Sequence, residues 1–212
     1  MKNLDPILNS GRETIRQNNE RLILDAAEKI FACHGFKGSS TMQIAKEANL
    51  PKANVHYYFK TKSDLYSRVL ENTLQDWMSA ASLFKTHEDP AVTLSNYIAA
   101  KMDLARNRPY GSRVWAKEIM SGASVIQKEM NSTLKNWVDE CSKTIDDWVK
   151  TEKIKPVNAK ALLYMIWATT QHYADFEFQI TALNDNKPLS DEEFEDKKKQ
   201  VIELILSGLG LR

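Results

Sequence analysis

Residues 41–62 read TMQIAKEANLPKANVHYYFKTK, and this stretch determines how the first third of the chain is interpreted. Thr41 is a suitable N-cap residue, and apolar side chains follow it at helical spacing at Met42, Ile44, Ala45 and Ala48. The triplet 49–51 (Asn-Leu-Pro) then interrupts the helix, and Pro51 is better tolerated in the first turn of a new helix than inside an old one. The pattern therefore predicts two short helices separated by a tight turn.

The second of these helices, predicted at 52–59, is crowded with basic, amide and aromatic side chains. They are Lys52, Asn54, His56, Tyr57, Tyr58, Lys60 and Lys62. A helix of this length fits the major groove of DNA, and these side chains can donate hydrogen bonds to phosphates and base edges. The sequence therefore indicates a helix-turn-helix.

Three spaced runs within and around this stretch are typical of a known family. They are the runs Phe31-(x)3-Gly35-Phe36, Thr41-(x)2-Ile44-Ala45 and Tyr57-Tyr58-Phe59-(x)2-Lys62-(x)2-Leu65. Together they resemble the N-terminal DNA-binding domain of TetR-type transcriptional regulators. The resemblance implies three helices, at about 13–34, 41–48 and 52–59, of which the third enters the major groove. It implies residues 1–62 as an N-terminal arm with a DNA-binding domain, and 63–212 as a second domain.

The resemblance also implies which residues contact DNA. Thr41, Tyr57, Tyr58 and Lys62 match family positions that typically contact phosphates. Lys52, Ala53 and Asn54 open the third helix and are candidates for base contacts, while His56 replaces the commoner tyrosine and can still donate to a phosphate. Arg12 and Arg16 form either an arm that contacts the minor groove or backbone, or a solvated tail.

Charge supports a DNA-binding N-terminal part even though the whole chain carries a net charge of only +1. Residues 1–62 contain ten Lys and Arg against six Asp and Glu, whereas the remaining 150 residues contain 19 against 22. The basic charge therefore lies on the predicted DNA-binding domain, which predicts salt-sensitive binding to double-stranded DNA.

Composition predicts an all-α protein, because seven glycines and six prolines accompany no strand alternation and no Asn-Gly hairpin signal. Two cysteines suggest neither a zinc site nor a disulfide framework, and the four histidines lack a ligand spacing, so no metal or cofactor is expected. No nucleophile elbow, phosphate loop or paired carboxylates indicate an enzyme. The chain shows neither an export signal nor a membrane span, which favours the cytoplasm.

The second domain reads as a series of amphipathic helices with short breaks. The expected ranges are 63–85, 91–106, 112–120, 124–153, 159–183 and 190–208, with Asn158 as a cap before the fifth. The apolar faces of the last two exceed the needs of one small pocket. We therefore expect them to pair two copies in a homodimer, which would present two DNA-reading helices to a palindromic operator.

Trp77, Trp115 and Trp167 fall on three different predicted helices, so they either are plain core or converge on a ligand site. Gln171 follows Trp167 by one helical turn on the same face. An amide beside an indole offers a donor and an acceptor next to a flat wall, and this pairing suits a planar ring with adjacent N–H and C=O groups.

A second resemblance concerns this domain. The segments Ser112-Arg113, Glu118-(x)3-Gly122-Ala123 and 165–176 (MIWATTQHYADF) resemble the ligand domain of the pyrimidine-utilisation regulators within the same family. It implies a homodimeric repressor released from DNA by uracil or thymine, with Trp77, Trp167 and Gln171 as pocket residues, followed by Trp115 and Glu118. The alternatives are a TetR-type regulator of another small hydrophobic ligand, or a helical protein-interaction module in which the tryptophans are plain core.

Overall fold

The computed structural model describes residues 6–85 and 89–211. These ranges form helices and turns and contain no strand, so the all-α prediction is confirmed. Contacts divide the chain into two compact units between Asn72 and Thr73, inside helix α4 (Lys62–Ala81). Residue 62, after which a domain boundary is expected from the sequence, is the first residue of α4, and the first half of this helix belongs to the N-terminal unit.

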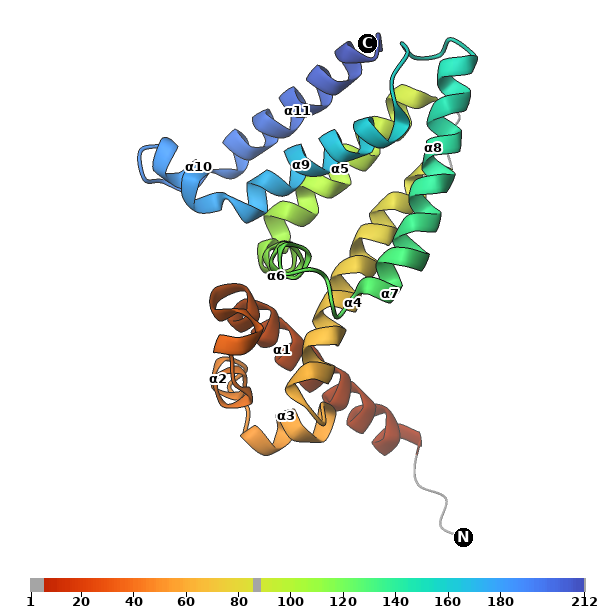
Figure 1. The fold of residues 1–212 in the computed structure, drawn as a ribbon. Coiled ribbons are helices and arrows are strands. Elements are labelled where there is room, and N and C mark those ends of the chain that lie inside the picture. The colour runs from red at the N-terminus through yellow and green to blue at the C-terminus, as the bar shows by residue number, and fades with distance from the viewer. Residues whose placement is uncertain (1–5, 86–88, 212) are drawn as a thin grey trace. The chain divides into compact units, whose positions relative to one another are not determined.

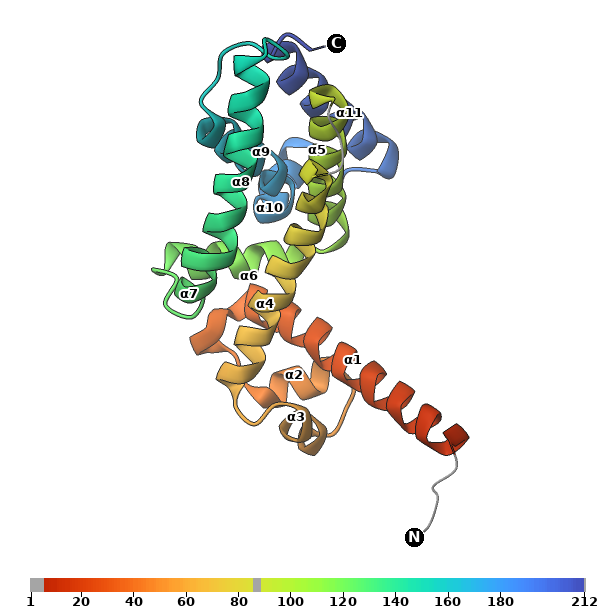
Figure 2. The ribbon, with the colours of Figure 1, turned by 90° about the vertical axis from the view of Figure 1, so that its right-hand side faces the viewer.

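The N-terminal unit contains α1 (Pro6–Gly38), α2 (Thr41–Glu47) and α3 (Lys52–Tyr58), followed by the first half of α4 (Figure 2). All three predicted helices of the DNA-binding domain are present, and α1 begins earlier than expected. The core comes from every helix of the unit, and its fully buried members are Ile23, Ala27, Ile44, Val55, Leu65 and Leu70. Phe31 is 1% exposed, and the edge of its ring packs against Tyr66 with the centroids 5.0 Å apart.

The start of α2 differs from the prediction by one residue, because the N-cap is Ser40 and Thr41 is already helical. The Ser40 hydroxyl accepts the backbone N–H of Gln43, and the Gln43 side chain accepts the backbone N–H of Ser40. This reciprocal capping box satisfies two helix-terminal donors. Asn49, with φ 52°, turns the chain out of α2, and Pro51 precedes the first residue of α3.

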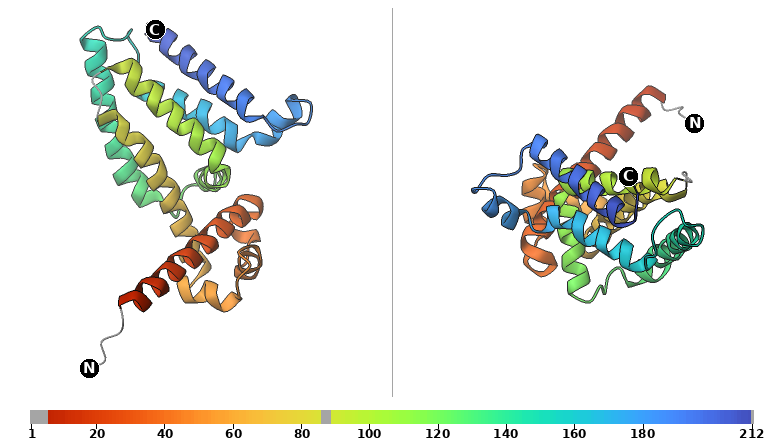
Figure 3. Two further views of the ribbon diagram at one scale, coloured as in Figure 1. Left: turned by 180° about the vertical axis from the view of Figure 1, so that it is seen from behind. Right: turned by 90° about the horizontal axis from the view of Figure 1, so that it is seen from above.

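The second unit begins with the second half of α4. Its elements are η1 (Ser82–Lys85), α5 (Pro90–Asn107), α6 (Pro109–Met120), α7 (Gln127–Glu129), the π-helical turn η2 (Met130–Leu134), α8 (Lys135–Lys150), α9 (Ala159–Asp175), α10 (Glu177–Leu183) and α11 (Asp191–Gly208). Helix α5 lies between α9 and α11, and α6 packs across α9 (Figures 1 and 3). The core includes the fully buried Leu94, Ile98, Met102, Ile145, Leu163 and Ile166.

Three predicted helix limits in this unit are wrong. The break after α5 is a single residue, Arg108, since Pro109 occupies the first turn of α6, where its missing N–H costs nothing. The helix expected at 124–153 is divided by the π-helical turn. The helix expected at 159–183 ends at Asp175, where Arg113 Nε donates to the carbonyl of Ala174 over 2.8 Å. A contact from α6 therefore satisfies a carbonyl at the end of α9.

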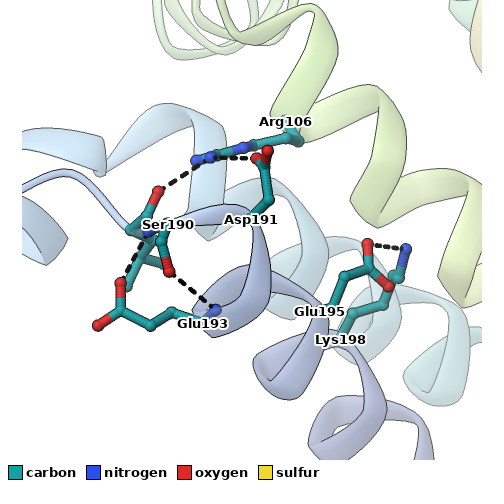
Figure 4. Close-up of polar contacts among 7 residues, drawn as sticks. Arg106, Ser190, Asp191, Glu193, Glu195 and Lys198 are labelled. Atoms are coloured by element: carbon teal, nitrogen blue, oxygen red, sulfur yellow. Dashed lines mark hydrogen bonds and ion pairs between the residues drawn. The ribbon is translucent and has the colours of Figure 1, made fainter.

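Side-chain caps fix the starts of α9 and α11. Asn158 caps α9 as predicted, by accepting the backbone N–H of Ala161. Ser190 and Glu193 form a capping box at the start of α11, and Arg106 from α5 binds Asp191 over 2.9 Å (Figure 4). In residues 6–85 and 89–211, no helix combines the length and the apolar character that crossing a bilayer requires.

Candidate DNA-binding surface and ligand cavity

Helix α3 carries the candidate base-contacting residues on its exposed side. Val55 is completely buried and anchors the helix in the core. Lys52, Ala53 and His56 are exposed, and Tyr57 is 76% exposed. Asn54 and Tyr58 are half-buried, and the Tyr58 ring meets Tyr57 edge to face. The predicted residues of α3 therefore form one accessible polar and aromatic surface.

The two predicted phosphate-contacting residues outside α3 occupy different environments. Thr41 is half-buried at the first residue of α2. The Lys62 ammonium donates to the carbonyl oxygens of Phe36 and Ser39 over 2.7 and 2.8 Å, and it lies 4.4 Å from the centroid of the Phe36 ring. Lys62 therefore links α4 to the last turn of α1 and to Ser39 after it, and it has one N–H left for another acceptor.

We expect Lys62→Met to lower the free energy of unfolding of the N-terminal unit by about 1.5 kcal/mol, because two hydrogen bonds from a charged group are lost at a half-buried site. Urea unfolding followed by circular dichroism measures the change. Lys60→Met is the control, since Lys60 is exposed. Equal effects of the two substitutions would show that the two carbonyl contacts contribute nothing.

The possible N-terminal arm is part of a helix, since positions 12 and 16 both lie within α1. Arg16 is exposed. The side chain of Arg12 lies outside the residues that are described, so its predicted DNA contact stays a prediction.

In the second unit, four of the five predicted ligand-binding residues line one cavity of about 60 Å³. Trp77 comes from α4, Trp115 from α6, and Trp167 and Gln171 from α9. The rings of Trp77 and Trp115 meet edge to face with centroids 5.0 Å apart. Three helices thus bring indole rings and a single amide together.

Glu118, the fifth predicted residue, is not among the residues that line this cavity. Its side chain is buried on α6, and its carboxylate accepts the backbone N–H of Val125 over 2.8 Å. Glu118 thus has a structural hydrogen bond to the loop that follows α6.

The sequence-based interpretation missed five residues that line the cavity: Met78, Tyr97, Lys101, Leu134 and Trp137. A signal existed for one of them, because Lys101 falls on the apolar stripe of α5 that includes Ile98 and Met102. A lysine at a core position of an amphipathic helix is rare without a function or a partner.

The polar groups of the cavity differ in whether they have partners. Trp167 Nε1 donates to the hydroxyl of Tyr97 over 2.8 Å, and burial raises the pKa of Tyr97. By contrast, Trp137 Nε1 is buried without an acceptor, and the Gln171 amide makes no hydrogen bond within the described part of the chain. Two residues that line the cavity therefore carry polar groups without a partner among the described residues.

Lys101 is the only described basic side chain that lines the cavity, and it is 4% exposed. Its Nζ lies 4.0 Å from the centroid of the Trp77 ring, which is the geometry of a cation–π contact. Burial lowers the pKa of Lys101 to about 7, although the charge of Asp175 opposes the shift. Burial in turn raises the pKa of Asp175. The cavity is therefore lined mainly by apolar side chains, but it also contains a lysine whose pKa lies near neutral pH.

Each of the two units matches the model of a known protein family. Residues 23–69 match the model of bacterial regulatory proteins of the tetR family, and residues 70–212 match the model of the YcdC-like protein C-terminal region. The chain therefore belongs to the TetR family of transcriptional regulators. Because the members of this family are transcriptional regulators, this chain is a DNA-binding regulator and not an enzyme.

Individual relatives are similar over nearly the whole length. The HTH-type transcriptional regulator RutR of Escherichia coli K12 is 36% identical over 191 residues, which covers 90% of each chain. The ketosteroid transcriptional regulator KstR2 of Mycobacterium tuberculosis has a TM-score of 0.74 at 13% identity, covering 90% of this chain and 94% of that one. AibR, solved with isovaleryl coenzyme A and operator DNA, has a TM-score of 0.69 at 16% identity, covering 88% and 97%. The two solved structures show that the fold is shared.

Proposed function

We propose that this chain is a homodimeric, cytoplasmic repressor that leaves its palindromic operator when a small planar ligand, uracil or thymine, binds each second unit. The observation that carries the proposal is the Gln171 amide. It lines an indole-walled cavity next to Trp167 and makes no hydrogen bond to the described protein. The resemblance of 165–176 to the pyrimidine-utilisation regulators favours the same class of ligand, and RutR is 36% identical to this chain.

The chemistry of the cavity matches a pyrimidine base. A primary amide presents one acceptor and two donors, which is complementary to adjacent N–H and C=O groups on a ring. The indoles supply flat apolar walls for that ring. Sites for drug-sized ligands measure about 300–1,000 Å³, so the 60 Å³ here favours a small ring over a long acyl chain.

Exposed apolar side chains on the last helices support pairing of two copies. Tyr164 and Met165 lie on α9, Phe178 and Leu183 on α10, and Leu204 on α11, and each is between 48% and 86% exposed. An apolar surface of this kind on a soluble domain marks an interaction site. A two-fold dimer through it would present two α3 helices to a palindromic operator.

The ligand would act through the preference of the protein for one arrangement of its two α3 helices. A ligand shifts such an equilibrium only by its different affinities for the two arrangements. Trp77 lies in the half of α4 that belongs to the second unit, and the other half belongs to the DNA-binding unit. Helix α4 therefore offers a continuous path from the cavity wall to the N-terminal unit.

We expect Tyr57→Phe to weaken binding to operator DNA about tenfold through loss of a hydrogen bond to a phosphate. The salt dependence of binding should stay the same, because a hydroxyl releases no counterion. Fluorescence anisotropy with DNA selected by the protein from a random pool measures both quantities, and Tyr110→Phe on α6 is the control. Unchanged affinity would remove Tyr57 from the DNA contact.

Calorimetric titration of the purified protein with uracil and thymine tests the ligand assignment. Saturable binding of either base, at one molecule per chain, is the expected result. Binding of neither base, together with binding of a larger apolar compound, would favour the alternative of a TetR-type regulator for another small hydrophobic ligand. Family membership already argues against a protein-interaction module.

A further inference from the structure

Lys101 lies where two hollows of the second unit meet. The cavity described above and an adjoining hollow of about 10 Å³ share Trp77, Lys101 and Gln171 as lining residues. A volume of about 10–15 Å³ accommodates one water-sized group. The small hollow is therefore large enough for a single oxygen or amino substituent of a ring that occupies the main cavity.

Burial of the Lys101 ammonium is energetically unfavourable when no ligand is bound. A buried ammonium without a hydrogen-bond acceptor is unfavourable, and no described residue accepts a hydrogen bond from Lys101 or pairs with it directly. The indole face of Trp77 compensates only part of the lost hydration. An oxygen acceptor supplied by a ligand would satisfy this group.

We propose that Lys101 determines the specificity of the ligand site by donating a hydrogen bond to an exocyclic oxygen of the ligand, so that the site selects oxo-substituted rings over amino-substituted rings. This inference rests on the proposed function, since it concerns the same cavity. It adds a residue and a selection rule that the pairing of Gln171 with the ring does not provide.

Gln171 alone cannot supply this selection. Rotation of its amide by half a turn exchanges the C=O and NH₂ groups, so it can pair with an oxo or an amino substituent. An ammonium has three donors and no acceptor, and it has no orientation that suits an amino group. Lys101 can therefore discriminate between oxo and amino substituents, whereas the Gln171 amide can pair with either.

The charge state of Lys101 also predicts how affinity depends on pH. An acceptor oxygen favours the ammonium, so uracil should raise the pKa of Lys101 from its value near 7 in the free protein. The affinity for uracil should be highest below pH 7 and should fall at higher pH, by up to about tenfold per pH unit. The charged or titratable groups that line the two hollows with Lys101 are Asp76 on α4, Tyr97 on α5 and Arg108 between α5 and α6. Asp175 at the end of α9 acts on Lys101 through its charge, and Arg113 and His172 act in the same way on Asp175. Three of the charged groups already have ion-pair partners, since Arg108 pairs with Asp76 and Arg113 with Glu177.

Titrations of the wild type and Lys101→Met with three rings test the proposal. Uracil carries two exocyclic oxygens, cytosine has an amino group in place of one of them, and isocytosine has an amino group in place of the other. We expect the wild type to bind uracil roughly tenfold to hundredfold more tightly than at least one of the amino analogues. Lys101→Met should lose that preference while it keeps its melting temperature, because a buried lysine is replaced by an apolar side chain of similar shape. Lys143→Met, at an exposed position on α8, is the control.

Each outcome either supports or contradicts the role of Lys101. An unchanged ratio of uracil to analogue affinity in Lys101→Met would overturn the role of Lys101 and leave the pyrimidine assignment intact. Absence of uracil binding by the wild type would overturn both. If Lys101→Met folds poorly, the wild-type affinity for uracil between about pH 6 and pH 8 decides instead. A decline above pH 7 supports the proposal, and a flat profile contradicts it.

Discussion

Phe31→Ala is expected to lower the free energy of unfolding of the N-terminal unit by about 3–5 kcal/mol, the range for removing a fully buried aromatic ring. The ring is 1% exposed and contacts Tyr66 edge to face, with Phe36 6.3 Å away between centroids. A domain of this size has a total stability of about 5–15 kcal/mol, so the loss can leave much of the unit unfolded. Thermal and urea unfolding measure the change.

The consequence for function should be loss of operator binding, although Phe31 itself lies in the core and away from the exposed face of α3. Ile15→Ala, on the same helix at a side chain that is 63% exposed, is the control and should change stability by less than about 0.5 kcal/mol. If Phe31→Ala were as stable as Ile15→Ala, the cluster of aromatic rings would not be the core of this unit.

Gln171→Ala is expected to weaken uracil binding roughly tenfold to hundredfold, because the ring would lose both hydrogen bonds to the amide. The melting temperature of the free protein should stay the same. Gln171 is half-buried and makes no hydrogen bond to the described residues, so the fold loses little with the amide. Isothermal calorimetry and a thermal melt of the same preparations separate the two effects.

The matched control is Gln75→Ala, at an exposed position on α4 close in sequence to the cavity residue Trp77. It should bind uracil as the wild type does. Wild-type affinity in Gln171→Ala would show that the amide does not contact the ligand, and the planar-ring assignment would then lose its main support.

Much of the fold could be predicted from the sequence because its signals are local. The break at 49–51 and the spacing of Ile44, Ala45 and Ala48 depend on neighbours in the chain, and the helix-turn-helix followed from them. The caps at Asn158 and Ser190 are also local. The cap of α2 was placed one residue too late, at Thr41, because the adjacent hydroxyl of Ser40 forms it.

The features that the sequence did not reveal depend on contacts between distant segments. Arg113 satisfies the carbonyl of Ala174 across 61 positions, so the end of α9 could not be placed from the sequence around it. Lys62 reaches back to Phe36 and Ser39 in the same way. Helical periodicity put Trp77, Trp115 and Trp167 on separate helices, but only the packing shows that Lys101 and Trp137 face the same cavity.

Release of DNA by a pyrimidine tests the central claim most directly. Wild type and Gln171→Ala would be bound to a labelled duplex that the wild-type protein selects from a random pool, and fluorescence anisotropy would follow the addition of uracil or thymine. We expect one of these bases to lower the affinity of the wild type for the duplex and to leave that of Gln171→Ala nearly unchanged. An unchanged affinity of the wild type at saturating uracil and thymine would contradict it.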